Sequence, residues 1–296
     1  MMGDLDGLAD LERSIAIAGE ANSPALARGY KNLSSALVDL GELERAFELQ
    51  GMFKQAAEHF GQHFEVRWAE VELAFEHYVR GDWDEAIRIA NTFIAAVEGG
   101  APHYMEGPCR DLRSLIRLAR GDPSGALEDS IAELDFARKV NDLQVLIPAL
   151  ATGAFVLVLT GRPADAAVLF DELLESLPSE YFGWGICSFE LAVALTDLGR
   201  GNELLGAAAR AARLTPWLEA AGALVSGEPA RAAEIYGQMG ARPQEAFARL
   251  NAAERLIAKN RRAEGDAELQ RALAFFRSVG ARAYIARGEA LLAASA

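Results

Sequence analysis

Apolar residues recur every three to four positions along most of the chain, which is the spacing of one face of an α-helix. In the segment NLSSALVDLG, Leu33, Leu37 and Leu40 follow this spacing. A second amphipathic segment, DWDEAIRIANTFIAAV, begins directly after Gly81 and again places apolar residues at helical intervals. The pattern therefore predicts an all-α protein built from pairs of helices joined by short turns.

A short motif, a glycine followed by a small residue about five positions later, marks the turn in each predicted pair. The turn positions are Gly41, Gly81, Gly121, Gly161, Gly199, Gly227 and Asn260, spaced by 40, 40, 40, 38, 28 and 33 residues. A repeat of this length is typical of a solenoid, in which each helix pair packs on its neighbours. We expect a single domain over 1–296, with a truncated first repeat at 1–20, seven repeats over 21–280 and a capping helix at 281–296.

The residues at each turn have a physical reason. Glycine takes up the positive φ that ends a helix sharply, and asparagine is the next best choice. Asp122 followed by Pro123 predicts an N-cap and a first helical residue. The small residue after the turn lets the two helices approach closely, and it is Ala46, Ala86, Ala126, Ala166 or Ala232. Leu204 and Gly265 replace it in two repeats, where we expect less regular packing.

Apolar and small residues before the turns follow a family pattern. Tyr30, Leu33, Ser34 and Leu37 give the order large, large, small, large, and the paired positions recur at Leu73-Ala74, Leu191-Ala192 and Ala252-Ala253. The pattern resembles the tetratricopeptide repeat (TPR), although most copies are longer than that family's usual length of about 34 residues. The resemblance covers nearly the whole chain and implies a right-handed superhelix.

The last part of the chain carries a narrower resemblance. The segments TPWLEAAGALVSGEPARAAEIYGQMGARPQEAFARL and ALAFFRSVGARAYIARGEALLAASA resemble the C-terminal TPR regions of two groups of large bacterial signalling proteins. One group is the nucleotide cyclases fused to an AAA-type ATPase module, and the other is the large ATP-binding LuxR-type regulators. In both, the enzymatic or DNA-binding part lies upstream. The resemblance implies a regulatory region of a larger protein.

The charge balance excludes one class of partner. The formal net charge is −14, and this sign argues against binding along a nucleic-acid backbone, which relies on Lys and Arg. Residues 251–296 carry eight basic and five acidic residues, but these alternate as on a solvated helix face.

Cys109 and Cys187 are 78 positions apart and indicate buried thiols in a reducing compartment. The apolar run at 148–161 is too short to span a bilayer and predicts a buried helix. We expect a cytoplasmic protein that binds neither nucleic acid nor membrane.

The sequence contains no catalytic or nucleotide-binding motif of the types GxxxxGK[ST], GxGxxG, GxSxG, HExxH or CxxC. His59 and His63 have the spacing of two metal ligands on one helix face, but Gly61 lies between them and no third ligand is apparent. His103 and Cys109 flank a proline-containing turn without an acid placed to orient the histidine. We therefore expect no enzymatic activity, no catalytic residues, no cofactor and no metal.

TPR superhelices bind partners on the concave surface formed by the first helix of each repeat, and the resemblance places a candidate site there. Its residues are Lys31, Ser35, Trp68, Val71, Phe75, Tyr78, Asp111, Leu115, Ala151, Phe155, Phe189 and Val193. Lys31 matches the family's clamp for a C-terminal carboxylate. Ser35, Glu72, Pro108 and Leu112 depart from that clamp, so we expect an aromatic groove for a hydrophobic or helical ligand. The alternative is that long helices curl tightly and these side chains fill the core.

Two functions are compatible with these features. The first is a non-catalytic protein–protein interaction scaffold that binds a protein, a peptide or another domain of the same full-length protein. The second is a sensor that binds a small ligand in the groove and controls an upstream cyclase, ATPase or transcription-regulator module. The first is favoured because no set of convergent polar residues marks a small-ligand pocket in the sequence.

Overall fold

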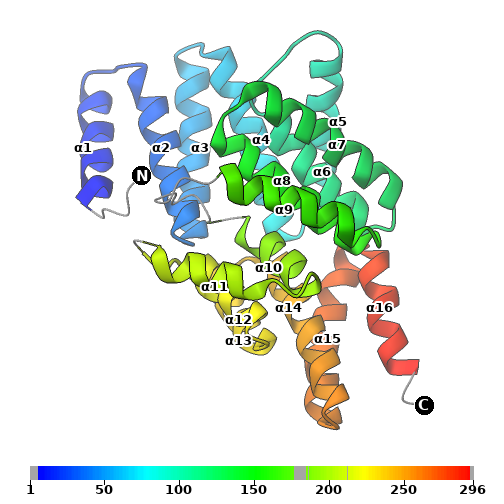
Figure 1. Cartoon of the computed structure of the whole chain (residues 1–296). Coiled ribbons are helices and arrows are strands. Elements are labelled where there is room, and N and C mark those ends of the chain that lie inside the picture. Colours follow the sequence, from blue (N-terminus) through cyan, green and yellow to red (C-terminus); the bar gives the residue numbers. More distant parts are fainter. Residues whose placement is uncertain (1–5, 177–184, 186, 212, 294–296) are drawn as a thin grey trace.

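A computed structural model describes residues 6–176, 185, 187–211 and 213–293. Over these residues all regular secondary structure is helical, as the sequence predicts, and no strand occurs (Figure 1). The first nine helices are α1 (Asp6–Glu20), α2 (Ala25–Asp39), α3 (Leu43–His59), α4 (His63–Arg80), α5 (Trp83–Glu98), α6 (Glu106–Ala119), α7 (Pro123–Val140), α8 (Leu143–Leu159) and α9 (Pro163–Ser176).

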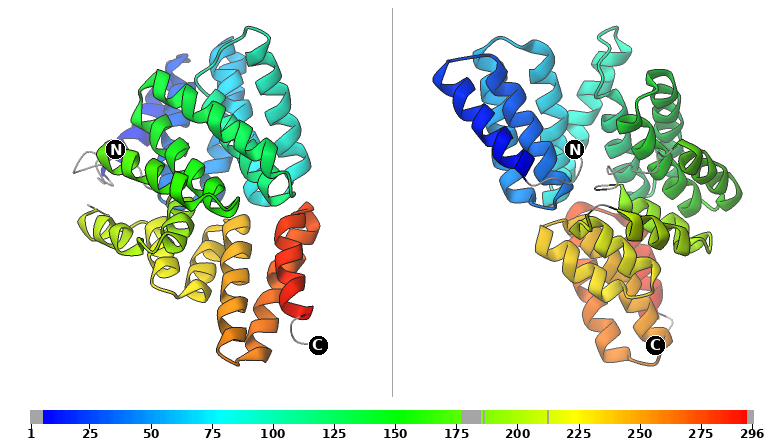
Figure 2. Two further views of the ribbon diagram at one scale, coloured as in Figure 1. Left: turned by 45° about the vertical axis from the view of Figure 1, so that its right-hand side comes forward. Right: turned by 60° about the vertical axis from the view of Figure 1, so that its left-hand side comes forward.

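The remaining helices continue the alternation. They are α10 (Ser188–Asp197), α11 (Gly201–Arg210), α12 (Pro216–Val225), α13 (Pro229–Met239), α14 (Arg242–Ala258), α15 (Arg262–Val279) and α16 (Arg282–Ala293). Helices α1–α9 form an upper tier and α10–α16 a lower tier, and the two tiers stay distinct in all three ribbon views (Figures 1 and 2). We use "upper tier" and "lower tier" for these two groups.

Positive φ angles separate the helices of each pair. They are 76° at Gly41, 84° at Gly81, 83° at Gly121, 79° at Gly161, 69° at Gly199, 81° at Gly227 and 59° at Asn260. At the end of α4 the Gly81 amide donates to the Tyr78 carbonyl, and the next amide, of Asp82, donates to the His77 carbonyl at 2.7 Å. These bonds satisfy the last carbonyls of the helix and turn the chain into α5.

The second helix of a pair begins close to the first. Ala46, Ala86, Ala126, Ala166 and Ala232 are completely buried in this position. Asp122 caps α7 by accepting a hydrogen bond from the Gly125 amide, and Pro123 is its first residue. Asp82, by contrast, makes no side-chain cap and lies 3.1 Å from His77 Nδ1.

Gly265 does not loosen its repeat. A Cβ at this position would lie 2.7 Å from Ile257 Cγ1 and 3.2 Å from the Ala253 carbonyl oxygen. Helices α14 and α15 therefore approach more closely here than an alanine allows. The packing at this turn is tight, and glycine fits where alanine would clash.

The core follows the even-numbered helices, which contact one another across repeats: α4 with α6, α6 with α8, α8 with α10, and α10 with α12. Helix α8 contains most of the apolar run at 148–161 and is largely buried. One continuous apolar core extends from α3 to α15 and includes both tiers, with smaller clusters among α1–α6. The even-numbered helices thus form the inner face that carries the candidate site.

Candidate functional site

The predicted concave residues lie on α2, α4, α6, α8 and α10, so they share the inner face. Their exposure differs along it. Ser35 is exposed, whereas Lys31, Trp68, Phe75, Asp111 and Leu115 are half-buried. The other members are buried: Val71, Tyr78, Ala151, Phe155, Phe189 and Val193. The exposed and half-buried members therefore lie on α2, α4 and α6, and all the members on α8 and α10 are buried.

The N-terminal end of the face is a network around Trp68. Lys31 Nζ lies 4.1 Å from the Trp68 ring centroid and 2.7 Å from Glu65 Oε2. The indole Nε1 of Trp68 donates to Glu72 Oε1 at 3.1 Å, and its ring stacks on Tyr104 with centroids 5.3 Å apart. Burial raises the pKa of Glu72 to about 7, although the bond from Trp68 lowers it. Lys31 is thus held by a carboxylate and a ring, and its charge is largely compensated.

The centre of the face packs against the chain's own C-terminal helices. Tyr78, Leu115, Phe155 and Phe189 surround a space of about 20 Å³ together with residues of α4–α6 and α14–α16. The other lining residues are Trp83, Ala119, Pro243, Phe247, Phe276 and Tyr284. A space of this size admits about one water molecule. The aromatic face is therefore filled from within the molecule, which is the alternative that the sequence left open.

Three side chains fasten the tiers to each other by donating to backbone carbonyls. Trp217 Nε1 donates to the Val38 carbonyl at 2.7 Å, and Arg120 Nε donates to the Val279 carbonyl at 3.2 Å. Arg242 Nη1 donates to the Arg80 carbonyl. Each acceptor lies in the last turn of a helix, where carbonyls lack an intrahelical partner. We call these three contacts the closure bonds.

Two of the turn glycines also lie in this junction. A Cβ at Gly41 would lie 2.7 Å from Met239 Sδ, and one at Gly81 would lie 2.9 Å from Phe275 Cε2. The turns at the ends of α2 and α4 therefore contact the lower tier directly. Glycine at these two positions provides both the positive φ and the close approach.

Three carboxyl groups, on α6, α7 and α10, form no ion pair among the described residues. Burial, and then the Asp111 carboxyl, raise the pKa of Glu190 to about 8. Burial raises the pKa of Asp111 to about 6. Burial and the carboxyls of Asp111 and Asp129 raise the pKa of Glu133 well above its usual value. Among the described residues, Glu190 Oε2, Glu133 Oε2 and Asp111 Oδ1 have no hydrogen-bond partner. With a pKa of about 8, Glu190 is therefore mostly uncharged at neutral pH.

Asp129 shows the opposite environment one helical turn before Glu133. Its carboxylate oxygens lie 2.5 Å from Arg113 Nη2, 2.8 Å from Arg117 Nη1 and 3.7 Å from Arg110 Nη1. This buried charge is paired, as buried charges in proteins usually are.

The candidate catalytic and metal-binding residues are not assembled into a site. Gly61 ends α3, so His59 and His63 lie on different helices. His103 Nε2 bonds to the Phe64 carbonyl and its Nδ1 accepts from the Met105 amide, so neither nitrogen faces a thiol. Burial raises the pKa of Cys109 to about 12, which keeps this thiol protonated. Among the described residues, no three His, Cys, Asp or Glu side chains are placed to hold a metal ion.

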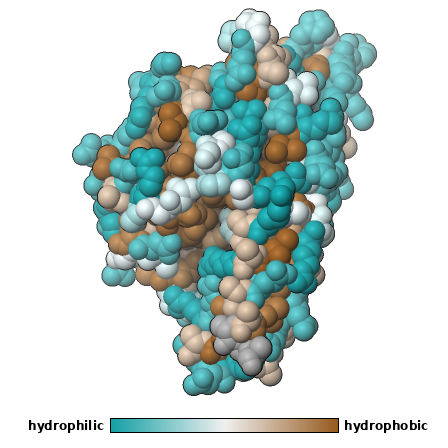
Figure 3. Space-filling view, turned by 90° about the vertical axis from the view of Figure 1, so that its right-hand side faces the viewer, coloured by the Kyte–Doolittle hydropathy of each residue, from teal (hydrophilic) through white to brown (hydrophobic). Residues whose placement is uncertain are grey.

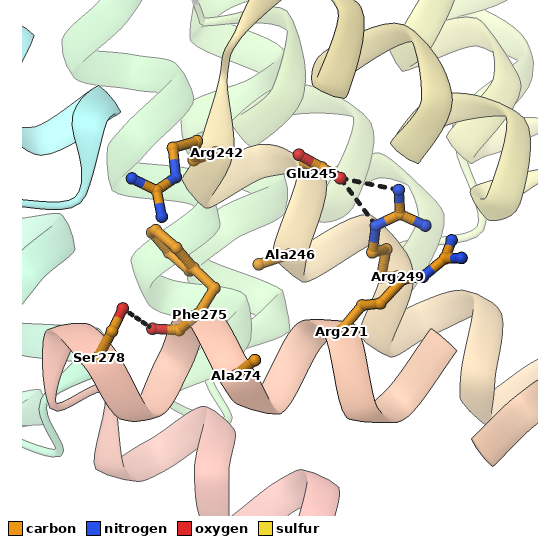
Figure 4. A pocket seen from close by; sticks show the side chains of 8 residues that line it. All are labelled: Arg242, Glu245, Ala246, Arg249, Arg271, Ala274, Phe275 and Ser278. Atoms are coloured by element: carbon orange, nitrogen blue, oxygen red, sulfur yellow. Dashed lines mark hydrogen bonds and ion pairs between the residues drawn. The ribbon is translucent and has the colours of Figure 1, made fainter. Parts of the chain in front are cut away.

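A second concavity lies between α14 and α15, and the sequence gives no signal for it. It measures about 350 Å³ and is lined by Arg242, Glu245, Ala246, Arg249, Arg271, Ala274, Phe275 and Ser278 (Figure 4). Ala246 and Ala274 face each other across its middle. We call this the arginine groove. Its lining alternates along two helices like any solvated face, so only the packing of those helices reveals it.

The outer surface is mixed in character. On the face shown in Figure 3, apolar areas are interrupted by polar side chains. No helix within the described ranges combines the length and the apolar character needed to cross a membrane. No family model matches the chain, and a search of curated proteins also finds no match.

Proposed function

We propose that this chain is a non-catalytic protein–protein interaction scaffold, a TPR-like regulatory region of a larger bacterial signalling protein. The order of helix pairs, with positive φ at each turn, supports a right-handed solenoid of repeats. The partner is a protein or peptide, or another domain of the full-length protein.

One observation carries the proposal: the inner face already holds helices. Helix α14 contacts α4, and α16 contacts α6, so two helices of the lower tier lie where a helical ligand would bind. Aromatic side chains meet across the two tiers, with the Phe155 and Phe247 centroids 6.1 Å apart and those of Trp83 and Phe275 5.9 Å apart. Such a face suits the apolar side of an amphipathic helix. A partner helix binds the inner face when helices α14–α16 move away from it.

The small-ligand sensor remains the second candidate. On the inner face its support is limited to the space of about 20 Å³, which is far below the roughly 300 Å³ at which ligand pockets begin. The arginine groove is large enough, and it lies outside the predicted concave residues.

Affinity purification from the native cell, followed by reconstitution of the complex from purified proteins, tests the scaffold. We expect a stoichiometric complex with cross-links to α4, α6 and α8, and faster hydrogen exchange in α14–α16 as the partner displaces them. A purified chain that turns over a substrate by itself would contradict the proposal. So would a complex that leaves exchange in α14–α16 unchanged and cross-links only to the outer helices.

A further inference from the structure

The arginine groove is hollow because two small residues face each other across its middle. Ala246 on α14 and Ala274 on α15 leave the space between the helices open, and larger side chains close its two ends (Figure 4). Arg242 and Phe275 form one end, where the guanidinium lies 5.3 Å from the ring centroid. Arg249 and Arg271 lie at the other end. The groove therefore has an apolar middle between two cationic ends.

The charges of the two ends are only partly neutralised. Arg249 is fully engaged, since Glu245 and Glu268 lie 2.8 Å and 2.7 Å from its nitrogens. Arg271 has one distant contact, 3.7 Å to Glu268, and its side chain is 64% exposed. Within the described residues no carboxylate pairs with Arg242, whose Nη1 donates to a backbone carbonyl. Each end thus keeps guanidinium donors for a ligand.

The spacing of the ends limits the ligand. Arg242 and Arg249 are seven residues apart on one helix, which is about 10 Å along its axis. The exposed side chain of Arg271 can lean over the alanines toward Arg242 and shorten this distance. A ligand that meets both ends needs two anionic groups joined by a short apolar spacer. The volume of about 350 Å³ falls within the range of small-molecule pockets.

We propose that the arginine groove binds a short aliphatic dicarboxylate, with one carboxylate at Arg242 and the other at Arg271. Guanidinium groups pair with carboxylates through two parallel hydrogen bonds, which favours carboxylate at both ends. The two alanines contact the methylene spacer. Phe275 holds the Arg242 guanidinium over its ring, so this end is positioned before the ligand arrives.

A spacer series tests the proposal on the full chain. Titrations with succinate, glutarate, adipate and suberate, followed by the amide resonances of α14 and α15 at low salt, are compared with butyrate. We expect one dicarboxylate to bind best, and to bind about tenfold more tightly than butyrate, because only the matching length engages both ends. Equal affinity for butyrate and every dicarboxylate would overturn the proposal.

Variants locate the binding in the groove. Arg271→Ala removes an exposed side chain and should weaken the best ligand about tenfold. Ala274→Leu fills the hollow at an exposed position without changing charge and should abolish binding. Arg277→Ala is the matched control, because this arginine is on the same helix and pairs with Glu289 outside the groove. Melting temperatures report folding. Unchanged binding by folded Ala274→Leu, or equal loss in Arg277→Ala, would also overturn the proposal.

Discussion

Glu190 is a buried acid without a cation, and its environment links stability to pH. Its pKa is about 8 in the folded protein, against an ordinary value of 4.5. The folded chain therefore keeps a proton that the unfolded chain releases as pH rises from about 4.5. The stabilisation that Glu190 contributes to the folded state is fully present below pH 4.5. It decreases as the pH rises from 4.5 to about 8 and is lost above pH 8. Asp111 and Glu133, whose pKa values are also raised, act in the same direction.

Replacing Glu190 by glutamine should stabilise the protein at pH 8 and flatten this pH dependence. Glutamine has nearly the shape of the protonated acid and carries no charge to bury. The gain at pH 8 should be a few kcal/mol, because each unit of pKa difference corresponds to about 1.4 kcal/mol. Urea unfolding at pH 5 and pH 8 measures it, with the exposed Glu48→Gln as control. A less stable Glu190→Gln protein at pH 8 would contradict the pH linkage.

At the scale of the helices, the sequence predicts the pairs well because glycine and asparagine carry a backbone signal. Every one of the seven turn positions has positive φ. Among the described residues, six others also have positive φ and lie between one pair and the next: Asn22, Gly61, Gly100, Asn141, Gly240 and Gly280. The same residue types mark both kinds of turn. The second kind is missed because no alanine follows it at a fixed spacing.

Ala86→Leu should destabilise the fold by roughly 1–3 kcal/mol. The residue is completely buried where α5 approaches α4, and a larger side chain there overpacks the pair. Ala96→Leu is the control, because Ala96 is exposed on the same helix. Urea unfolding compares the midpoints of the two variants. Equal midpoints would mean that the helices separate at Ala86 without loss of stability.

The arrangement of the whole molecule is what the sequence predicts least well. Helical spacing and the family resemblance predict which residues lie on the inner face. They do not predict that helices of the lower tier cover it. The closure bonds join residues 159 to 179 positions apart. Their acceptors are backbone carbonyls, which every residue type has, so the sequence gives no sign of them. The arginine groove is hidden for a similar reason. Alanine at positions 246 and 274 leaves a hollow only because of how α14 and α15 pack there.

Arg120→Ala should loosen the two tiers without unfolding them. It removes two hydrogen bonds to the Val279 carbonyl and an ion pair with Asp84. We expect hydrogen exchange to rise about tenfold or more in α15 and α16, because bonds from charged donors contribute about 1.5–3 kcal/mol. Arg138→Ala is the control, since its partner Glu172 lies within the upper tier. An equal rise in hydrogen exchange over all helices, or no rise in α15 and α16, would contradict a role for Arg120 in holding the two tiers together.

The order of synthesis gives the covered inner face a further consequence. Tyr78 is made 206 residues before Tyr284, which lines the same small space. At about 5–20 residues per second, ribosomes take roughly 10–40 s to bridge this interval. Throughout it the nascent chain exposes aromatic side chains that the finished molecule buries. In that period a chaperone, or a neighbouring nascent chain on the same messenger, reaches the face without having to displace the lower tier.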